Sequence, residues 1–159
     1  MPTNIVVRHP MSVSLLKALM EDHPELKANW VFDANDKTVV VEGADRLAMT
    51  VENGLLVRLD LTDPALKGAL KLYASYGLEH LHINCPQVTE LEIECLWDLA
   101  SLSVENLSFS GLSGELSLDG LPKLSHLQIS RSGLSDLAPL KHLSSLKTLD
   151  LSHNAIQSA

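Results

Sequence analysis

A leucine motif that recurs about every 22 residues constrains the fold more than any other feature of the sequence. Its clearest copy, "LKTLDLSHNAI", is centred on Leu149, and three more copies are centred on Leu127, Leu81 and Leu59. The first and last gaps are 22 residues, and the middle gap of 46 residues leaves room for one more copy. A fixed period in this range is typical of a solenoid, in which each repeat forms one coil and buries its apolar residues by stacking on its neighbours.

The register of the middle copy stays open. Leu99, Leu102 and Val104 fit the motif, and Val104, Leu107 and Phe109 fit it equally well. Either choice gives the same number of coils between Leu59 and Leu149, so the ambiguity affects which side chains share a row and not the architecture.

A second rhythm runs at half this period. "LHINCPQVTE" is followed by "LEIECLWDLAS", and "LSFSGLSGE" is followed by "LSLDGLPKLSH". A coil of this kind needs about 20 residues to close, and these half-repeats are only about half as long. We therefore expect the half-repeats to lie on the opposite wall of each coil.

The motif has a direct physical interpretation. In Leu149-Asp150-Leu151 the alternation directs both leucines inward and the aspartate outward on a short strand. Each strand is expected to pair in parallel with the same strand of the next coil, so that the central leucines form one buried row. The amide of Asn154, at the ninth place, can satisfy backbone groups where the chain turns. In other copies that place holds Pro64, Pro86 and Ser132.

On these residues the chain resembles leucine-rich repeat proteins, whose motif is L-x-x-L-x-L-x-x-N-x-L. "GLSDLAPLKHLSSLKTLDLSHNAI" is similar to the repeats of bacterial internalin-like proteins, and the half-period resembles the nested bacterial class called IRREKO. The resemblance covers roughly residues 56–156. It implies an α/β fold, namely a right-handed leucine-rich repeat solenoid with a parallel β-sheet of about five strands over residues 56–159.

Residues 1–55 are expected to form a small N-terminal α+β cap over the first coil, with a distinct recognition domain as the alternative. Leucine spacing predicts a helix over about 13–22, and two strands are expected around the turn residues 34–37. Asn53-Gly54 between apolar runs predicts a β-hairpin. The segment "DPALKGALKLYASYG", residues 63–77, is expected to be helical on the convex side of the first coil.

The resemblance implies that partners bind the outward residues of the strands, on the concave wall. This predicted binding surface is polar and nearly free of the aromatic residues that dominate tight interfaces. Its principal members are Arg58, Asp60, His80, His82, Asn84, His126, Gln128 and Asp150. The half-repeat wall carries an acidic stripe of Glu90, Glu92 and Glu94, which suits either simple solvation or a basic peptide or cation.

For the remaining candidate residues, the sequence favours a structural role over a metal or catalytic site. His80 and His82 share a strand face near Cys85 and Cys95, a combination that zinc accepts. Both cysteines hold the eighth place of their units, however, where small thiols commonly pack in a turn. We therefore predict no metal site. The chain has no G-x-S-x-G elbow, no phosphate-binding loop and no H-E-x-x-H motif, so we predict no catalysis and no cofactor.

Composition limits the partners and the compartment. The net charge of −8 disfavours nucleic acid and anionic membranes and would suit a basic protein partner. The sequence shows no signal peptide and no apolar run of membrane-spanning length, and two cysteines are too few for a disulfide framework. These features favour the cytoplasm.

The main functional hypothesis is a non-catalytic protein–protein interaction module. The alternative is the N-terminal recognition part of a larger effector or enzyme whose catalytic region is absent from this chain. A third and weaker hypothesis is a small metal-binding or hydrolytic protein centred on His80 and His82. The last repeat carries Leu149, Leu151 and Ile156 to an uncapped edge, so we expect that either further coils or a second copy, in a homodimer, would cover it.

Overall fold

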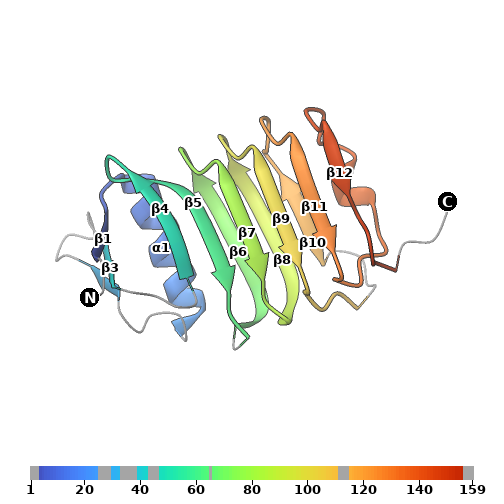
Figure 1. Cartoon of the computed structure of the whole chain (residues 1–159), viewed down its shortest axis with the longest axis horizontal. Helices are drawn as coiled ribbons and strands as arrows, with labels where there is room; N and C mark the ends of the chain where they lie inside the picture. Colours follow the sequence, from blue (N-terminus) through green and yellow to red (C-terminus); the bar gives the residue numbers. More distant parts are fainter. Residues whose placement is uncertain are drawn as a thin grey trace.

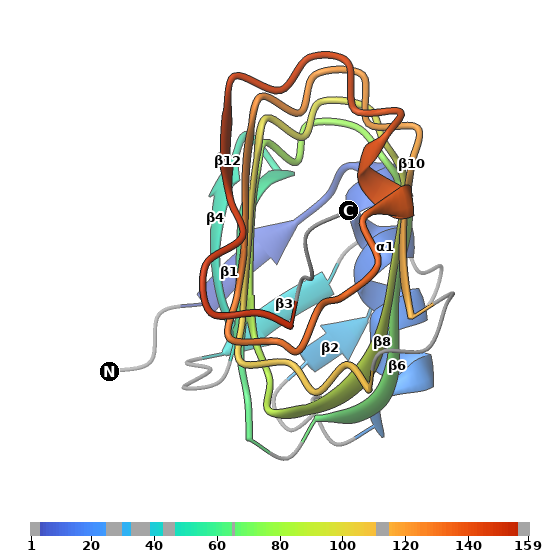
Figure 2. The same cartoon turned by 90° about the vertical axis from the view of Figure 1, so that its right-hand side faces the viewer.

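The structure is a computed structural model that describes residues 4–24, 30–32, 39–42, 47–64, 66–110 and 115–155. It is a β-solenoid, in which flattened coils stack along the long axis of the molecule (Figure 1). Seen along the stack, the coils superpose and their strands form two opposite walls (Figure 2). The solenoid expected from the repeat is therefore confirmed.

One wall is a six-stranded sheet in the order β12-β11-β9-β7-β5-β4. Its strands are β4 (Leu47–Glu52), β5 (Leu55–Thr62), β7 (His80–Asn84), β9 (Ser101–Glu105), β11 (His126–Ser130) and β12 (Thr148–Asp150). All neighbours from β5 to β12 pair in parallel. Leu102 pairs with both Leu81 and Leu127, so the register of the middle copy is the one that begins at Leu99.

The other wall is a three-stranded parallel sheet in the order β10-β8-β6. Its strands are β6 (Lys67–Ser75), β8 (Gln87–Leu96) and β10 (Leu116–Asp119). Leu91 of β8 pairs with Leu70 and Leu116, and the three side chains are buried between the walls. The prediction that the half-repeats lie on the opposite wall is confirmed.

The prediction of a helix over residues 63–77 is wrong, because most of this segment forms β6. Leu70 and Leu72 are buried while Lys71 and Tyr73 are exposed, an alternation with the period of a strand. The two leucines extend the apolar rows of β8, and that burial outweighs the local preference for a helix. Gly68 adopts a φ of 81°, which is outside the helical region and accompanies a register shift in the pairing with β8.

Helix α1 (Pro10–Asp22) includes the predicted helix and begins three residues earlier. Nδ1 of His9 caps it by accepting the N–H of Met11 at 3.3 Å, and Pro10 suits the first turn because no helical partner is needed for its nitrogen. The helix packs against β6 and buries Leu16 and Leu19 completely. It therefore covers the first coil at the N-terminal end of the stack (Figure 1).

Two polar contacts attach α1 to the coil. The hydroxyl of Ser12 accepts the N–H of Leu56 at 3.1 Å, and Nε2 of His23 lies 2.9 Å from the carbonyl oxygen of Ala69. Ser12 and His23 are both buried, so these bonds satisfy polar groups that have lost water.

A small antiparallel sheet lies beside α1, in the order β1-β3-β2. Its strands are β1 (Asn4–Val7), β2 (Trp30–Phe32) and β3 (Val39–Glu42), which confirms the two strands expected around residues 34–37. Those turn residues themselves lie outside the described part of the chain.

The hairpin predicted at Asn53-Gly54 joins β4 and β5, which pair in antiparallel fashion. Asn53 has a φ of 53° and Gly54 a φ of 82°, the two positive values that a tight two-residue hairpin turn requires. A Cβ on Gly54 would lie 2.9 Å from Cβ of Arg8, so close packing as well as φ requires glycine here. The hairpin places β4 along the N-terminal edge of the six-stranded sheet.

The central leucines form one continuous row, as predicted, but not all of them are buried. Leu59, Leu81, Leu102 and Leu127 are at most 2% exposed, whereas Leu149 is 49% exposed. The prediction that Leu149 is buried is wrong, because β12 is the outermost strand and no described coil lies beyond it. Ile156 lies outside the described residues, and a homodimer through this edge stays a prediction.

Candidate functional site: the outer face of the six-stranded sheet

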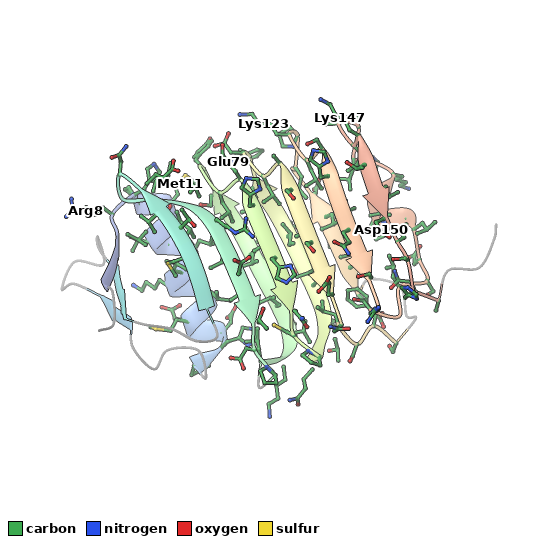
Figure 3. The ribbon with its side chains drawn as sticks, in the orientation of Figure 1. Arg8, Met11, Glu79, Lys123, Lys147 and Asp150 are labelled. Atoms are coloured by element: carbon green, nitrogen blue, oxygen red, sulfur yellow. The ribbon has the colours of Figure 1, made fainter. Side chains whose placement is uncertain are left out.

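The sheet face is the name we give to the outward side chains of β5, β7, β9, β11 and β12. They form rows across the coils, because residues at the same place of each motif pair with one another. The first row contains Arg58, His80, Ser101, His126 and Thr148. The second contains Asp60, His82, Ser103, Gln128 and Asp150, and the third contains Thr62, Asn84, Glu105 and Ser130. All eight residues of the predicted binding surface therefore lie on the sheet face, and their role in binding stays a prediction. Figure 3 labels one of them, Asp150 of β12.

Side-chain hydrogen bonds between neighbouring coils fix the rotamers of this face. Oγ of Ser103 donates to Oε1 of Gln128 at 3.2 Å, and Nδ2 of Asn106 donates to Oδ1 of Asn84 at 3.2 Å. The residues that make these bonds therefore have less side-chain freedom left to lose when a partner binds.

Other groups of the sheet face are already engaged within a coil. Arg58 pairs with Asp60 at 3.3 Å, and Oδ1 of Asp150 accepts the N–H of Ser152 at 2.9 Å. Two hydrogen bonds from Ser152 lower the pKa of the Asp150 carboxyl from its ordinary value. The larger effect comes from the Ser152 side chain and the smaller from its backbone N–H. The imidazoles of His80 and His82, by contrast, make no hydrogen bond within the described residues.

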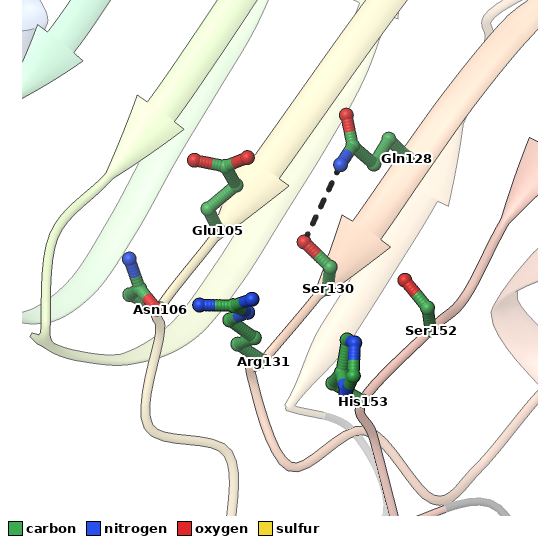
Figure 4. A pocket seen from close by; sticks show the side chains of 7 residues that line it. All are labelled: Glu105, Asn106, Gln128, Ser130, Arg131, Ser152 and His153. Atoms are coloured by element: carbon green, nitrogen blue, oxygen red, sulfur yellow. Dashed lines mark hydrogen bonds between the residues drawn. The ribbon is translucent and has the colours of Figure 1, made fainter.

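A polar depression of about 350 Å³ lies at the carboxyl ends of β9, β11 and β12 (Figure 4). It is lined by Glu105, Asn106, Gln128, Ser130, Arg131, Ser152 and His153. Gln128 was predicted to lie on the binding surface, whereas Arg131 and His153 were not. Both residues come after the end of a strand, so the alternation of inward and outward side chains does not predict where their side chains point.

A left-handed backbone conformation sets the direction of the Arg131 and His153 side chains. Asn106, Arg131 and His153 each follow a strand of the sheet face and adopt φ values of 61°, 53° and 59°. They occupy the eighth place of successive motifs, the place that Cys85 occupies in an earlier coil. The expectation that this place packs in a turn holds for Cys85, which is 0% exposed, but Arg131 and His153 are exposed. A comparison of the residues at the eighth place of each copy would have identified Arg131 and His153, whereas the leucine positions do not.

The histidines and cysteines that suggested a metal site are not brought together. Sγ of Cys85 points inward and donates to the carbonyl oxygen of Leu61 at 3.7 Å, while His82 faces outward. Cys95 lies near the end of β8, on the opposite wall of the solenoid. Within the described ranges, no three His, Cys, Asp or Glu side chains are grouped so that they could hold a metal ion.

The two thiols are expected to differ in reactivity. Burial raises the pKa of Cys85 to about 11, whereas Cys95 is half-buried near the end of β8. Because the thiolate is the reactive form, we expect an aromatic disulfide reagent at about pH 8 to modify Cys95 in the folded protein and Cys85 only after unfolding. Absorbance of the released thiolate measures this, and Cys95→Ser should abolish the native reaction. Rapid modification of Cys85 in that variant would contradict the burial described here.

The acidic stripe lies on the outer surface of the other wall. Glu90, Glu92 and Glu94 all face outward from β8, as the alternation predicts. The carboxylate of Glu92 accepts a hydrogen bond from Tyr73 and is the main cause that raises the pKa of the phenol to about 12. Desolvation and then the charge of Glu92 raise the pKa of Glu94. Binding of a basic peptide to this stripe stays a prediction.

Within the described part of the chain, no helix has both the length and the apolar character needed to cross a membrane. Comparison of the chain with profiles of known protein families, with curated proteins and with solved structures finds no match. The function therefore has to be argued from the site itself.

Proposed function

We propose that this protein is a non-catalytic protein–protein interaction module that presents the sheet face to a protein partner. One observation carries the proposal: outward polar side chains from five parallel strands lie in register on one continuous sheet. Such a surface offers many hydrogen-bonding groups at fixed spacing. A partner gains these bonds without the cost of ordering loops.

The contacts on this face support a binding surface rather than an active site. Two of its hydrogen-bonded pairs, Ser103–Gln128 and Asn106–Asn84, join amides and hydroxyls, and in a third pair Nδ1 of His126 lies beside the hydroxyl of Thr148. The first two pairs contain no base beside a nucleophile. In the third, no described residue hydrogen-bonds to the other ring nitrogen of His126, so the pair lacks the third group that orients a catalytic base. The imidazoles of His80 and His82 offer uncommitted ring nitrogens that a partner can use.

We further propose that the solenoid is of the leucine-rich repeat type. The buried leucine row and the bonds of Asn154 to the preceding coil support this assignment. Interaction through the open strand face is the use that this resemblance implies. The same proposal includes a bacterial source and a cytoplasmic location for the protein.

A matched pair of variants tests the proposed surface. Ser103 sits at the middle of the sheet face, and Glu90 is an exposed residue of the opposite wall. Ser103→Arg adds a bulky cation to the proposed interface and should weaken partner binding by about tenfold or more, which corresponds to about 1.4 kcal/mol. Glu90→Arg adds the same group elsewhere and should change binding less than about twofold.

The partner is first captured with the unmodified chain and identified by cross-linking and mass spectrometry. Binding of the purified partner to each variant is then measured by calorimetry. Cross-links confined to the three-stranded wall, together with a loss of binding in Glu90→Arg alone, would show that the sheet face is not the interface.

A further inference from the structure

The polar depression contains an arginine whose charge is not neutralised. The guanidinium of Arg131 makes no ion pair and no side-chain hydrogen bond with any described residue. Arg58, the arginine of the sheet face, is paired with Asp60 at 3.3 Å. Arginine is enriched among residues that dominate interfaces, because its planar fork matches a carboxylate with two parallel hydrogen bonds.

The floor of the depression offers a second donor. Ser130 is only 5% exposed, and its hydroxyl accepts a hydrogen bond from Nε2 of Gln128 at 3.5 Å. The hydroxyl hydrogen of Ser130 has no acceptor among the described residues. A buried hydroxyl without an acceptor is uncommon, and a ligand oxygen in the depression would supply one.

The remaining lining residues define the charge of the site. His153 and Ser152 add further polar groups beside Arg131. Glu105 is the one carboxylate that lines the depression, and its side chain forms no ion pair with Arg131. In Figure 4 the Arg131 side chain extends from the end of β11 toward Glu105 and Asn106 of the preceding coil. Arg131 therefore remains available to an outside anion, and Glu105 weakens that attraction without cancelling it.

From this arrangement we infer that the polar depression binds a carboxylate group of the protein partner, with Arg131 as the cationic anchor and the Ser130 hydroxyl as the second donor. The inference rests on the proposed function, because it assigns the sheet face a partner segment of stated chemistry. That segment carries either an Asp or Glu side chain or a free chain terminus. A small monoanion fits the two donors, and the nearby Glu105 disfavours ligands of higher negative charge.

Three small probes test the site without knowledge of the partner. N-acetyl-glutamate amide supplies a side-chain carboxylate, N-acetyl-diglycine supplies a terminal carboxylate, and N-acetyl-glutamine amide is the uncharged control. Titration of the isotope-labelled protein is followed by NMR, using backbone resonances of Ser130, Arg131 and Ser152. We expect saturable shifts with one or both carboxylate probes and none with the amide control, and the stronger probe identifies the source of the carboxylate.

Variants separate binding from a structural role. Arg131→Gln should weaken binding of the carboxylate probes by about tenfold, whereas Arg8→Gln, which removes an exposed arginine outside the sheet face, should change their binding less than about twofold. Glu105→Gln should tighten binding about threefold, because a repelling charge is removed. If Arg131 served only to neutralise Glu105, the Glu105→Gln variant would show no gain.

The outcomes distinguish this inference from the proposed function. Equal shifts with the amide control, or equal affinities for Arg131→Gln and the unmodified chain, would overturn the carboxylate site. If the carboxylate site is overturned but Ser103→Arg still abolishes partner binding, the sheet face remains the interface. Circular dichroism of each variant confirms that it is folded, and the Glu105→Gln gain cannot arise from misfolding.

Discussion

Leu127→Ala is expected to lower the free energy of unfolding by about 2–5 kcal/mol. Leu127 is 2% exposed and lies in the leucine row between Leu102 and Leu149, with which it pairs. Truncation to alanine removes apolar surface that is buried in the core. It also leaves a cavity between the two walls, because their strands are fixed by hydrogen bonds. Urea denaturation followed by circular dichroism measures the change.

The same chain provides a matched control for this prediction. Leu149 occupies the same place of the motif but is 49% exposed on β12. Leu149→Ala should therefore cost less than about 1 kcal/mol, because little transfer free energy and no enclosed cavity are involved. Equal costs for the two substitutions would show that a further layer of the protein covers β12, or that the row is not packed as described.

Asn154→Ala is expected to cost about 2–4 kcal/mol, although the residue is only half-buried. Oδ1 of Asn154 accepts the N–H groups of Ser132 at 3.1 Å and Leu134 at 3.2 Å. Its Nδ2 donates to the carbonyl oxygens of Ile129 at 2.6 Å and Leu151 at 2.9 Å. Alanine leaves four backbone groups of two coils without these partners, and each net hydrogen bond contributes about 0.5–1.5 kcal/mol.

Two comparisons isolate the cause of this loss. Asn154→Asp keeps the acceptor and removes the donors, so it should be intermediate in stability. Asn84→Ala removes an amide of the sheet face that, among the described residues, hydrogen-bonds through its side chain to Asn106 alone, and should cost about 1 kcal/mol or less. A cost for Asn154→Ala no greater than that for Asn84→Ala would show that the turn does not depend on the asparagine. Thermal and urea unfolding of the three variants provide the comparison.

Local patterns were sufficient to predict the main architecture. Alternation in "LDL" and its relatives predicted which residues face inward, because strand geometry directs successive side chains to opposite sides. The 22-residue period then predicted that equivalent strands pair in parallel, and the eight predicted residues of the sheet face do lie together. Asn154 was likewise identified, because its hydrogen bonds join backbone groups at defined positions of the repeat.

Neighbouring elements decided the features that the patterns missed. "KGALKLYAS" contains good helix formers, yet it forms β6 because Leu70 and Leu72 complete the apolar rows of β8. The polar depression was missed as a unit, since its members come from three coils and two of them, Arg131 and His153, depend on a left-handed backbone position.

The sequence by itself determined the coil, its period and the polar character of the sheet face, because these follow from spacing along the chain. Only the tertiary structure decided the register of the middle copy, the strand at residues 67–75, the exposure of Leu149 and the lack of an ion pair between Arg131 and any described residue. The physical reason is that burial and ion pairing depend on what lies across the gap between coils. Residues about 22–25 positions apart in sequence set that environment, and no local pattern encodes it.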